Sequence, residues 1–179
     1  MPDLARLLAD DLAEERSLVA GSAGYAALRA RDAVRREQVK ALLSEHAELA
    51  ADKLYAAAWI LNHGDTVEEA RTAHELAMRA AIQGYAPAKW LAAASLDRSL
   101  MYSGRPQRYG TNIVPDGAGY RLWDVEPETT DAERAEWNVP SLEEMRERAA
   151  RLSSRTPQPP LEAAPEWLLA AIHRWNAAE

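Results

Sequence analysis

The sequence contains no cysteine. Disulfide bonds, thiolate nucleophiles and cysteine metal sites are therefore excluded as explanations of its fold or function. Phenylalanine is also absent, and six tryptophans and six tyrosines supply the large aromatic side chains. Each of these carries an N–H or O–H group, so we expect the aromatic packing to bring polar tips that need hydrogen-bond partners.

Long hydrophobic runs are missing as well. No stretch of about 18 apolar residues is present, which argues against a transmembrane helix. The first residues, MPDLARLLADDLAEER, contain early acids and lack the apolar centre of a signal peptide. These features predict a cytoplasmic protein without a membrane partner.

Positively charged residues are outnumbered: the sequence has 21 Lys and Arg and 28 Asp and Glu, giving a net charge of −7. A nucleic-acid surface needs clustered positive charge, so we expect no nucleic-acid partner. Glycine-rich phosphate loops and the GxSxG nucleophile elbow are also lacking. We therefore predict no cofactor. The arginine run within 25–43 could bind an anion, but its pattern is more typical of a solvated helix face.

Helical periodicity is what the sequence does contain, and 179 residues suffice for one domain with a core. Helices are predicted over 3–19, 25–43, 44–62, 67–83, 86–102, 130–137, from Ser141 onward, and over 164–177. Ser44 is expected to begin the third of them, and Gly64 to end it as a left-handed residue. Thr130 or Asp131, and Ser141 with Glu144 in a capping box, mark two later helix starts.

The region 104–125 has a different character. Asn112-Ile-Val and Tyr120-Arg-Leu-Trp flank the turn sequence Pro115-Asp-Gly-Ala-Gly, which indicates a short β-hairpin. The predicted fold class is all-α: a multi-helix bundle of antiparallel helical hairpins with a loop or short β-hairpin insertion near 104–125. The helical domain is expected over 1–152 and a linker over 153–160. The C-terminal helix within 161–179 should dock on the body of the domain or form a homodimer contact.

Three polar groups are candidates for chemistry. The first is Asp97-Arg98, two full charges inside the otherwise apolar helix 86–102. Buried charges need partners, and adjacent residues project about 100° apart on a helix, so the two cannot fully satisfy each other. They are expected either to form a structural ion-pair network or to form the floor of a ligand site, with Arg98 binding an anionic group.

The second candidate is the end of the helix 44–62, where Asn62-His63-Gly64-Asp65 follows Trp59 on the same face. A histidine there caps the helix dipole, or acts as a base if a carboxylate holds its Nδ1 proton. The third candidate is the segment 104–111. Alternate residues of an extended chain point the same way, so Gln107, Tyr109 and Thr111 are expected to project together.

A metal site was weighed for His63 and Asp65, together with Glu45, His46 and Asp52 on the preceding helix. No HExxH or other spacing places two ligands on one face. We therefore predict no bound metal.

Three segments, AAWILNHGD (57–65), LDRSLMYSGRPQRYGT (96–111) and TDAERAEWNVPSLEEM (130–145), together resemble an uncharacterised bacterial family, domain of unknown function 6624. The resemblance covers about residues 50–145 and implies no particular reaction. That family often carries Gln where this chain has Asn62 and Asn112, which shortens the reach of both side chains. The matching positions are His63, Asp65, Asp97, Arg98, Gln107, Tyr109, Gly110, Thr111, Asp131 and Arg134.

Two functions follow as hypotheses. In the first, the protein is a cofactor-independent acid/base enzyme of the hydrolase, lyase, isomerase or cyclase type, acting on a small anionic molecule such as one of bacterial secondary metabolism. Its catalytic residues would be His63, Asp65, Asp97 and Tyr109, and its substrate-binding residues Arg98, Gln107, Thr111 and Trp59. In the second, the protein is a non-catalytic ligand-binding or interaction module, and the polar cluster is structural.

Overall fold

The computed structural model describes residues 3–14, 22–46 and 48–177. The protein is mainly α-helical and includes a small antiparallel sheet of two strands, as the sequence predicts. Its elements are α1 (Leu4–Leu12), α2 (Ala23–Glu45), α3 (Ala51–Leu61), α4 (Val67–Ile82), α5 (Ala88–Tyr102), β1 (Ile113–Pro115), β2 (Tyr120–Leu122), α6 (Asp131–Glu136), α7 (Leu142–Arg155), η1 (Leu161–Ala163) and α8 (Glu166–Asn176).

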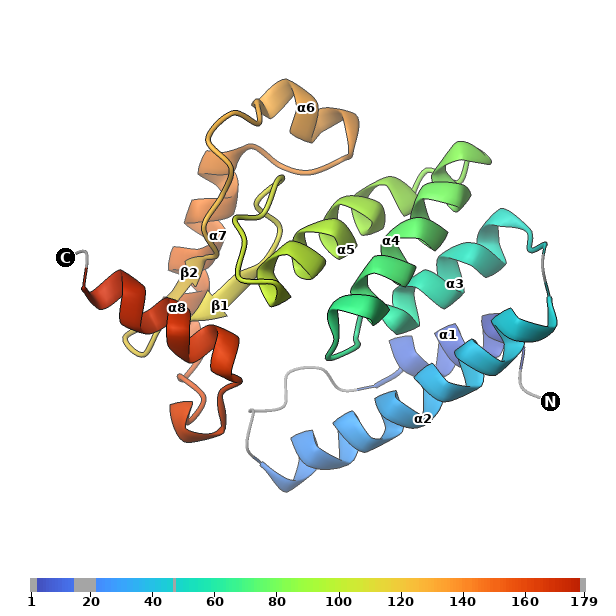
Figure 1. Cartoon of the computed structure of the whole chain (residues 1–179), viewed down its shortest axis with the longest axis horizontal. Coiled ribbons are helices and arrows are strands. Elements are labelled where there is room, and N and C mark those ends of the chain that lie inside the picture. Colours follow the sequence, from blue (N-terminus) through green and yellow to red (C-terminus); the bar gives the residue numbers. More distant parts are fainter. Residues whose placement is uncertain (1–2, 15–21, 47, 178–179) are drawn as a thin grey trace.

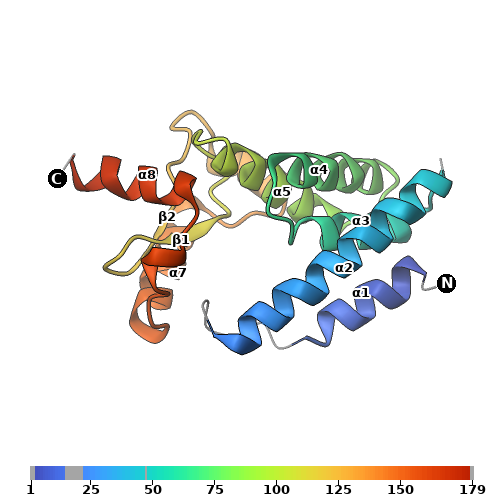
Figure 2. The ribbon, with the colours of Figure 1, turned by 60° about the horizontal axis from the view of Figure 1, so that its bottom comes forward.

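Helix α5 connects two groups of elements (Figure 1). In the first group, α1 packs against α3, α3 against α4, and α4 along α5. The long helix α2 lies beside α1 and also contacts α3, as Figure 2 shows from another side. In the second group, α7 packs against β2, and α8 lies on the far side of the hairpin (Figure 1). The loop that follows α5 therefore lies between the two groups.

The core of the first group is rich in alanine. Ala57, Ala73, Ala77 and Ala92 are buried where α3, α4 and α5 meet, and larger side chains such as Leu54 fill the spaces between them. Small side chains let helix axes approach closely, since the interaxial distance depends on the residues at the contact. This close packing fixes the end of α3 against α5, which matters for the site described below.

The core of the second group is built on tryptophan. Trp123 packs edge-on against Trp175 of α8, in a cluster that also contains Met101 and Val114. The tryptophan N–H groups find the partners that the composition led us to expect: Trp123 donates to the Arg105 carbonyl at 2.7 Å, and Trp175 donates to Asp124 at 2.8 Å. Helix α8 therefore docks on its own chain.

Several predicted elements are confirmed. The hairpin pairs Ile113 with Leu122 and Pro115 with Tyr120. Capping boxes begin α6 at Thr130 and α7 at Ser141. Among the described helices, none combines the length and apolar character that a membrane crossing requires.

Other predicted boundaries are wrong. Ser44 lies inside α2 and does not begin α3, because its hydroxyl is bonded back to the Ala41 carbonyl, an interaction that a helix interior tolerates. The first part of the expected linker, 153–155, is helical, since Ser153 ties α7 to the backbone of Tyr120. The later half of the first predicted helix, 15–19, lies outside the described residues.

Candidate functional site

The structure divides the predicted site residues into two places. Trp59, His63 and Asp65 lie at the end of α3, where Arg98 of α5 binds the neighbouring Asn62 carbonyl. Asp97 begins the other group, because its side chain turns toward the loop that follows α5. No contact among the described residues joins the His63 side chain to Tyr109. The single cluster expected from sequence is therefore two clusters.

The first cluster is arranged around the His63 ring, whose side chain is 20% exposed. Its Nδ1 atom lies 3.4 Å from the Asp11 carboxylate of α1. This is an ion-pair distance, but the angles do not make a hydrogen bond, and Nδ1 has no hydrogen-bond partner. Trp59 packs edge-on against the ring and donates its N–H to the same Asp11 carboxylate at 2.9 Å.

The carboxylate beside His63 is thus neither of those that the sequence suggested. Asp65 is bound instead by Arg29 and Arg36, and Asp97 is held by the loop after α5. Asp11 could not be inferred because it lies on another helix, and its position depends on how α1 packs against α3.

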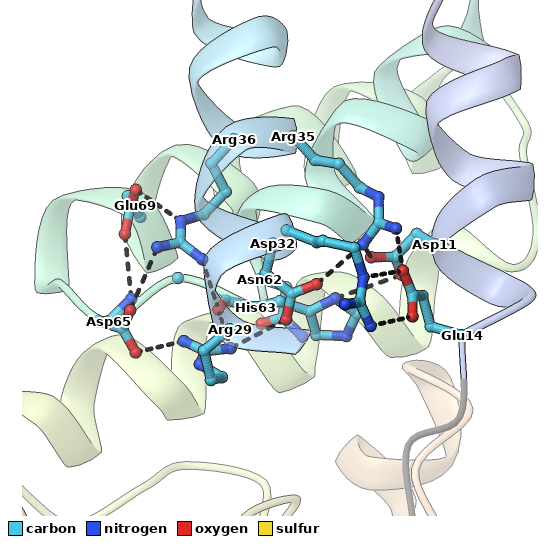
Figure 3. Close-up of polar contacts among 12 residues, drawn as sticks. Asp11, Glu14, Arg29, Asp32, Arg35, Arg36, Asn62, His63, Asp65 and Glu69 are labelled. Carbon is cyan, nitrogen blue, oxygen red and sulfur yellow. Dashed lines mark hydrogen bonds and ion pairs between the residues drawn. The ribbon is translucent and has the colours of Figure 1, made fainter. Parts of the chain in front are cut away.

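Helix α2 supplies a network of arginines to this region (Figure 3). Arg36 donates to Glu69 at 3.1 Å, to Asp65 at 3.2 Å and to the His63 carbonyl at 3.2 Å. Arg29 donates to the same carbonyl at 2.9 Å. These bonds satisfy a carbonyl oxygen at the end of α3, one of the acceptors that a helix leaves unpaired.

The prediction of a solvated arginine face on α2 is therefore wrong for its inner residues. Arg35 and Arg36 are buried, and the buried positions of α2 run as a stripe through Leu28, Asp32 and Val39. The stripe has helical spacing, so its charged members occupy positions where a core face would continue. This spacing could have predicted from the sequence that the arginines are buried and paired, because charged residues between two apolar positions on one face must have partners when buried.

Gly64 lets the chain turn sharply between α3 and α4. Its φ is not positive, so the left-handed conformation expected for it is wrong. Glycine is required here because a side chain would have no room: a Cβ at this position would lie 2.4 Å from Glu69 Oε2 and 2.6 Å from Glu69 Cβ. Glu69 in turn accepts the Asp65 N–H at 3.0 Å, and Tyr102 donates to the Gly64 carbonyl at 3.0 Å.

Arg98 differs from the arginines of α2. Its Nη1 donates to the Asn62 carbonyl at 2.6 Å, but its buried Nε has no hydrogen-bond partner. Within the described part of the chain, no carboxylate lies within ion-pair distance of it. The neighbouring Asn62, only 6% exposed, has an unpartnered Oδ1. Unpartnered buried polar atoms are rare in native proteins, and of the five found among the described residues three come from Asn62, His63 and Arg98 at this helix end, while the others are Arg134 Nη2 and Gln158 Nε2.

The second cluster is centred on Asp97, which is fully buried. Its Oδ1 accepts the backbone N–H groups of Arg108 and Tyr109 at 2.7 and 2.9 Å. Its Oδ2 accepts the N–H and hydroxyl of Thr111 at 3.0 and 2.8 Å. Burial raises the pKa of the Asp97 carboxyl above its ordinary value, and the four donors oppose that rise. With both oxygens occupied, this carboxylate holds the loop on the end of α5.

Gln107 has a similar role and is also fully buried. Its side chain accepts the Asn112 N–H at 2.9 Å and donates to the Trp123 carbonyl at 3.0 Å. The extended arrangement expected for 107–111 is wrong, because Gly110 adopts a φ of +85° and turns the chain. Gln107 and Thr111 therefore both meet Asn112.

The Tyr109 side chain points away from this bonding and packs with Ala93, Val139 and Trp137. Burial is the largest cause of a raised pKa for its hydroxyl. The phenol therefore stays neutral as the pH rises through tyrosine's ordinary pKa. Arg134, which the resemblance also singled out, is buried and donates to the Tyr109 carbonyl at 2.9 Å.

The described residues contain no cluster of side chains that could bind a metal ion. Over residues 3–14, 22–46 and 48–177, no three His, Asp or Glu side chains come close enough together to hold an ion.

Glu14 connects the end of α1 to α2. It accepts hydrogen bonds from Arg31 at 2.7 and 2.8 Å and a further one from Arg35. These bonds, chiefly those from Arg31, lower the pKa of Glu14 from its ordinary 4.5 to about 2.

The hydrogen bonds from Arg31 and Arg35 to Glu14 should make the stability of the fold depend on pH. A carboxyl with a depressed folded-state pKa stabilises the fold above its ordinary pKa and loses that contribution as the pH falls through the depressed value. We expect Glu14→Gln to be less stable than the wild type at neutral pH, and the difference to shrink as the pH falls from 4.5 to about 2. Urea unfolding at a series of pH values measures it. Glu75→Gln, an exposed change on α4, is the control, and a pH-independent difference would contradict the assignment.

Comparison with known proteins adds no information on this site. No family model matches the chain, and neither the curated proteins nor the solved structures contain a match.

Proposed function

We propose that the protein binds a small anionic molecule at the end of α3 and that His63 exchanges a proton with it. The observation that carries this proposal is Arg98, a partly buried cation without a carboxylate partner among the described residues. A buried unpaired guanidinium is costly, and an anionic ligand would compensate it. Asn62 Oδ1 beside it is also unpartnered, and as an acceptor it would bind a hydroxyl or other donor group of the ligand.

The charges around this place support an anion at Arg98 rather than elsewhere. Arg29, Arg35 and Arg36 each have carboxylate partners on neighbouring elements. Their positive charge is thus already compensated within the fold. Arg98 has a carbonyl oxygen as its partner, and a carbonyl carries no compensating charge.

His63 has the surroundings of an acid/base group. Asp11 lies beside Nδ1, and a carboxylate in this position favours the tautomer that leaves Nε2 free to accept a proton. Trp59 holds both the ring and Asp11 in place, which makes it a positioning residue. In this proposal Asp97, Gln107 and Thr111 shape the loop and do not touch the ligand, and Tyr109 lies apart.

Pyruvate is a suitable probe, because it combines a carboxylate with exchangeable carbon-bound protons. We expect the protein to accelerate exchange of its methyl protons in D2O, measured by loss of the proton NMR signal, with saturation as pyruvate increases. His63→Gln should return the rate to that of buffer. Arg98→Met should raise the half-saturating concentration at least about tenfold, the effect of losing roughly 1.4 kcal/mol of binding.

Two controls make this test decisive. Arg79→Met, a change at an exposed arginine of α4, should leave exchange unaltered. Exchange at the buffer rate with the wild-type protein would refute the proton-transfer role. Failure of pyruvate to shift the His63 ring resonances would refute anion binding at this place.

A structural role for the cluster at the end of α3 is the second candidate, and the contacts of Trp59 with the His63 ring and with Asp11 favour it. The two functions differ in the thermal stability of His63→Ala; Tyr109→Phe does not separate them, because the Tyr109 side chain packs elsewhere. A nearly unchanged melting temperature supports the ligand site, and a large decrease supports the structural network. Membership of the domain of unknown function 6624 family stays a proposal, supported by the segments quoted from the sequence.

A further inference from the structure

Helix α7 presents three arginines to a groove that the proposed site does not include. Arg148, Arg151 and Arg155 follow one another at spacings of three and four residues, which places them on one side of the helix. The groove has a volume of about 470 Å³. Met145 and Leu152 of the same helix line it, and the hairpin forms its opposite wall through Ile113.

The chemistry of the groove is divided between floor and rim. Met145 is buried and Leu152 partly buried, so the floor is apolar, whereas the arginines are exposed. Their charge is little compensated: Arg151 pairs with the exposed Glu147 at 3.1 Å, and within the described ranges Arg148 has only a weak contact with the Met145 sulfur at 3.9 Å. Arg155 has no acidic partner among the residues that the structure describes. The three arginines are the charged residues that line the groove, so its rim is positive on a chain of net charge −7.

The walls of the groove are held in place by interactions already described. Ser153 of α7 accepts the Tyr120 N–H at 2.6 Å and donates to the Tyr120 carbonyl at 3.0 Å, which fixes the helix against the hairpin. Thr111, at the end of the groove, is bound by Asp97 through both its N–H and its hydroxyl. A site whose walls are fixed before binding loses less conformational entropy when a ligand enters.

We propose that this groove binds a small amphiphilic anion, with an apolar tail on the Met145, Leu152 and Ile113 surface and an acidic head group at the arginines. The volume falls in the range of small-molecule sites, which extends from about 300 to 1,000 Å³. Guanidinium groups bind carboxylates and phosphates through paired hydrogen bonds, so several arginines on one rim favour such a head group. A ligand with only a tail would contact only the apolar floor, and one with only a charge would contact only the arginines.

Three probes separate these contributions: octanoate has both parts, 1-octanol only the tail, and acetate only the charge. Binding to the full-length protein is measured by calorimetry and by the methyl NMR signals of Ile113 and Leu152, which report on this groove. We expect octanoate to bind saturably and at least about tenfold more tightly than either other probe. The double variant Arg148→Gln/Arg155→Gln should weaken octanoate at least tenfold.

Arg146→Gln is the matched control, since this exposed arginine is on α7 but does not line the groove. It should leave octanoate affinity within a factor of two, and so should Arg98→Met, which belongs to the proposed site at α3. The proposal is overturned if octanoate does not saturate, or if 1-octanol or acetate binds as tightly. Equal weakening by Arg146→Gln would overturn it too, because it would show attraction to the overall charge of the helix.

Discussion

Asp97→Asn is expected to lower the free energy of unfolding by about 3 kcal/mol, because it removes two of four acceptor interactions in the interior. Asparagine has nearly the shape of aspartate, but an NH2 group replaces one of the two side-chain oxygens. Its amide would face either the N–H groups of Arg108 and Tyr109 or the N–H and hydroxyl of Thr111. In the first orientation both N–H groups would meet a donor; in the second the Thr111 N–H would, while its hydroxyl could turn to accept. Each unsatisfied buried group costs about 1–3 kcal/mol.

Urea unfolding and thermal melting measure this effect. For a chain of this size, a loss of about 3 kcal/mol corresponds to a decrease of roughly 10 °C in melting temperature. Asp10→Asn is the matched control, since the Asp10 side chain is 58% exposed and should change stability by less than about 0.5 kcal/mol. If Asp97→Asn were as mild as this control, Asp97 would not be holding the loop, and its role would have to be sought in ligand binding.

Sequence reasoning identified Asp97 and Arg98 because two charges within an apolar helix conflict with their surroundings. It could not tell which of the two is compensated. The answer depends on the loop: Gly110 turns the chain so that three backbone N–H groups converge on Asp97, whereas Arg98 is left facing the end of α3. Local spacing determines neither arrangement, because each brings together elements that meet only after folding.

The α-helices and the hairpin were predictable, since capping residues and periodic apolar positions are local features. Thr130 and Ser141 begin their helices as capping boxes require. The partners of buried charges were not predictable in the same way. Arg35 and Arg36 look like members of a solvated basic run until α1 and the α3–α4 turn bring Glu14 and Glu69 to them.

The hydrogen bonding of the two clusters indicates which of them can bind a ligand. Both carboxylate oxygens of Asp97 and both the side-chain oxygen and nitrogen of Gln107 are engaged by the protein itself, which leaves them no capacity for a ligand. His63 and Arg98 keep unpartnered atoms at a place where the arginines of α2 have already neutralised the carboxylates. The ligand site proposed at the end of α3 would thus depend on the network that holds Asp65 and Glu69.

Gly64→Ala tests that dependence, and we expect it to cost about 3 kcal/mol of stability. A methyl group would lie 2.6 Å from Glu69 Cβ, so the backbone of the α3–α4 turn must move, and overpacking of this kind costs about 1–3 kcal/mol. The movement also displaces Glu69 from Arg36 and Lys40, adding the loss of the buried Arg36–Glu69 pair and of the partly exposed Lys40–Glu69 pair. Denaturant unfolding measures the total.

Gly84→Ala provides the contrast, because Gly84 has a φ of +88° and nothing within 4 Å of an added Cβ. Its cost is backbone strain alone, about 1–2 kcal/mol. Combining Gly64→Ala with Glu69→Ala should cost less than the sum of the two single changes, since Glu69→Ala already lacks the ion pairs and two of the three clashing atoms, although its Cβ still meets the new methyl. Additive costs would show that Gly64 and Glu69 are not in the close contact on which the turn, and with it the position of His63, depends.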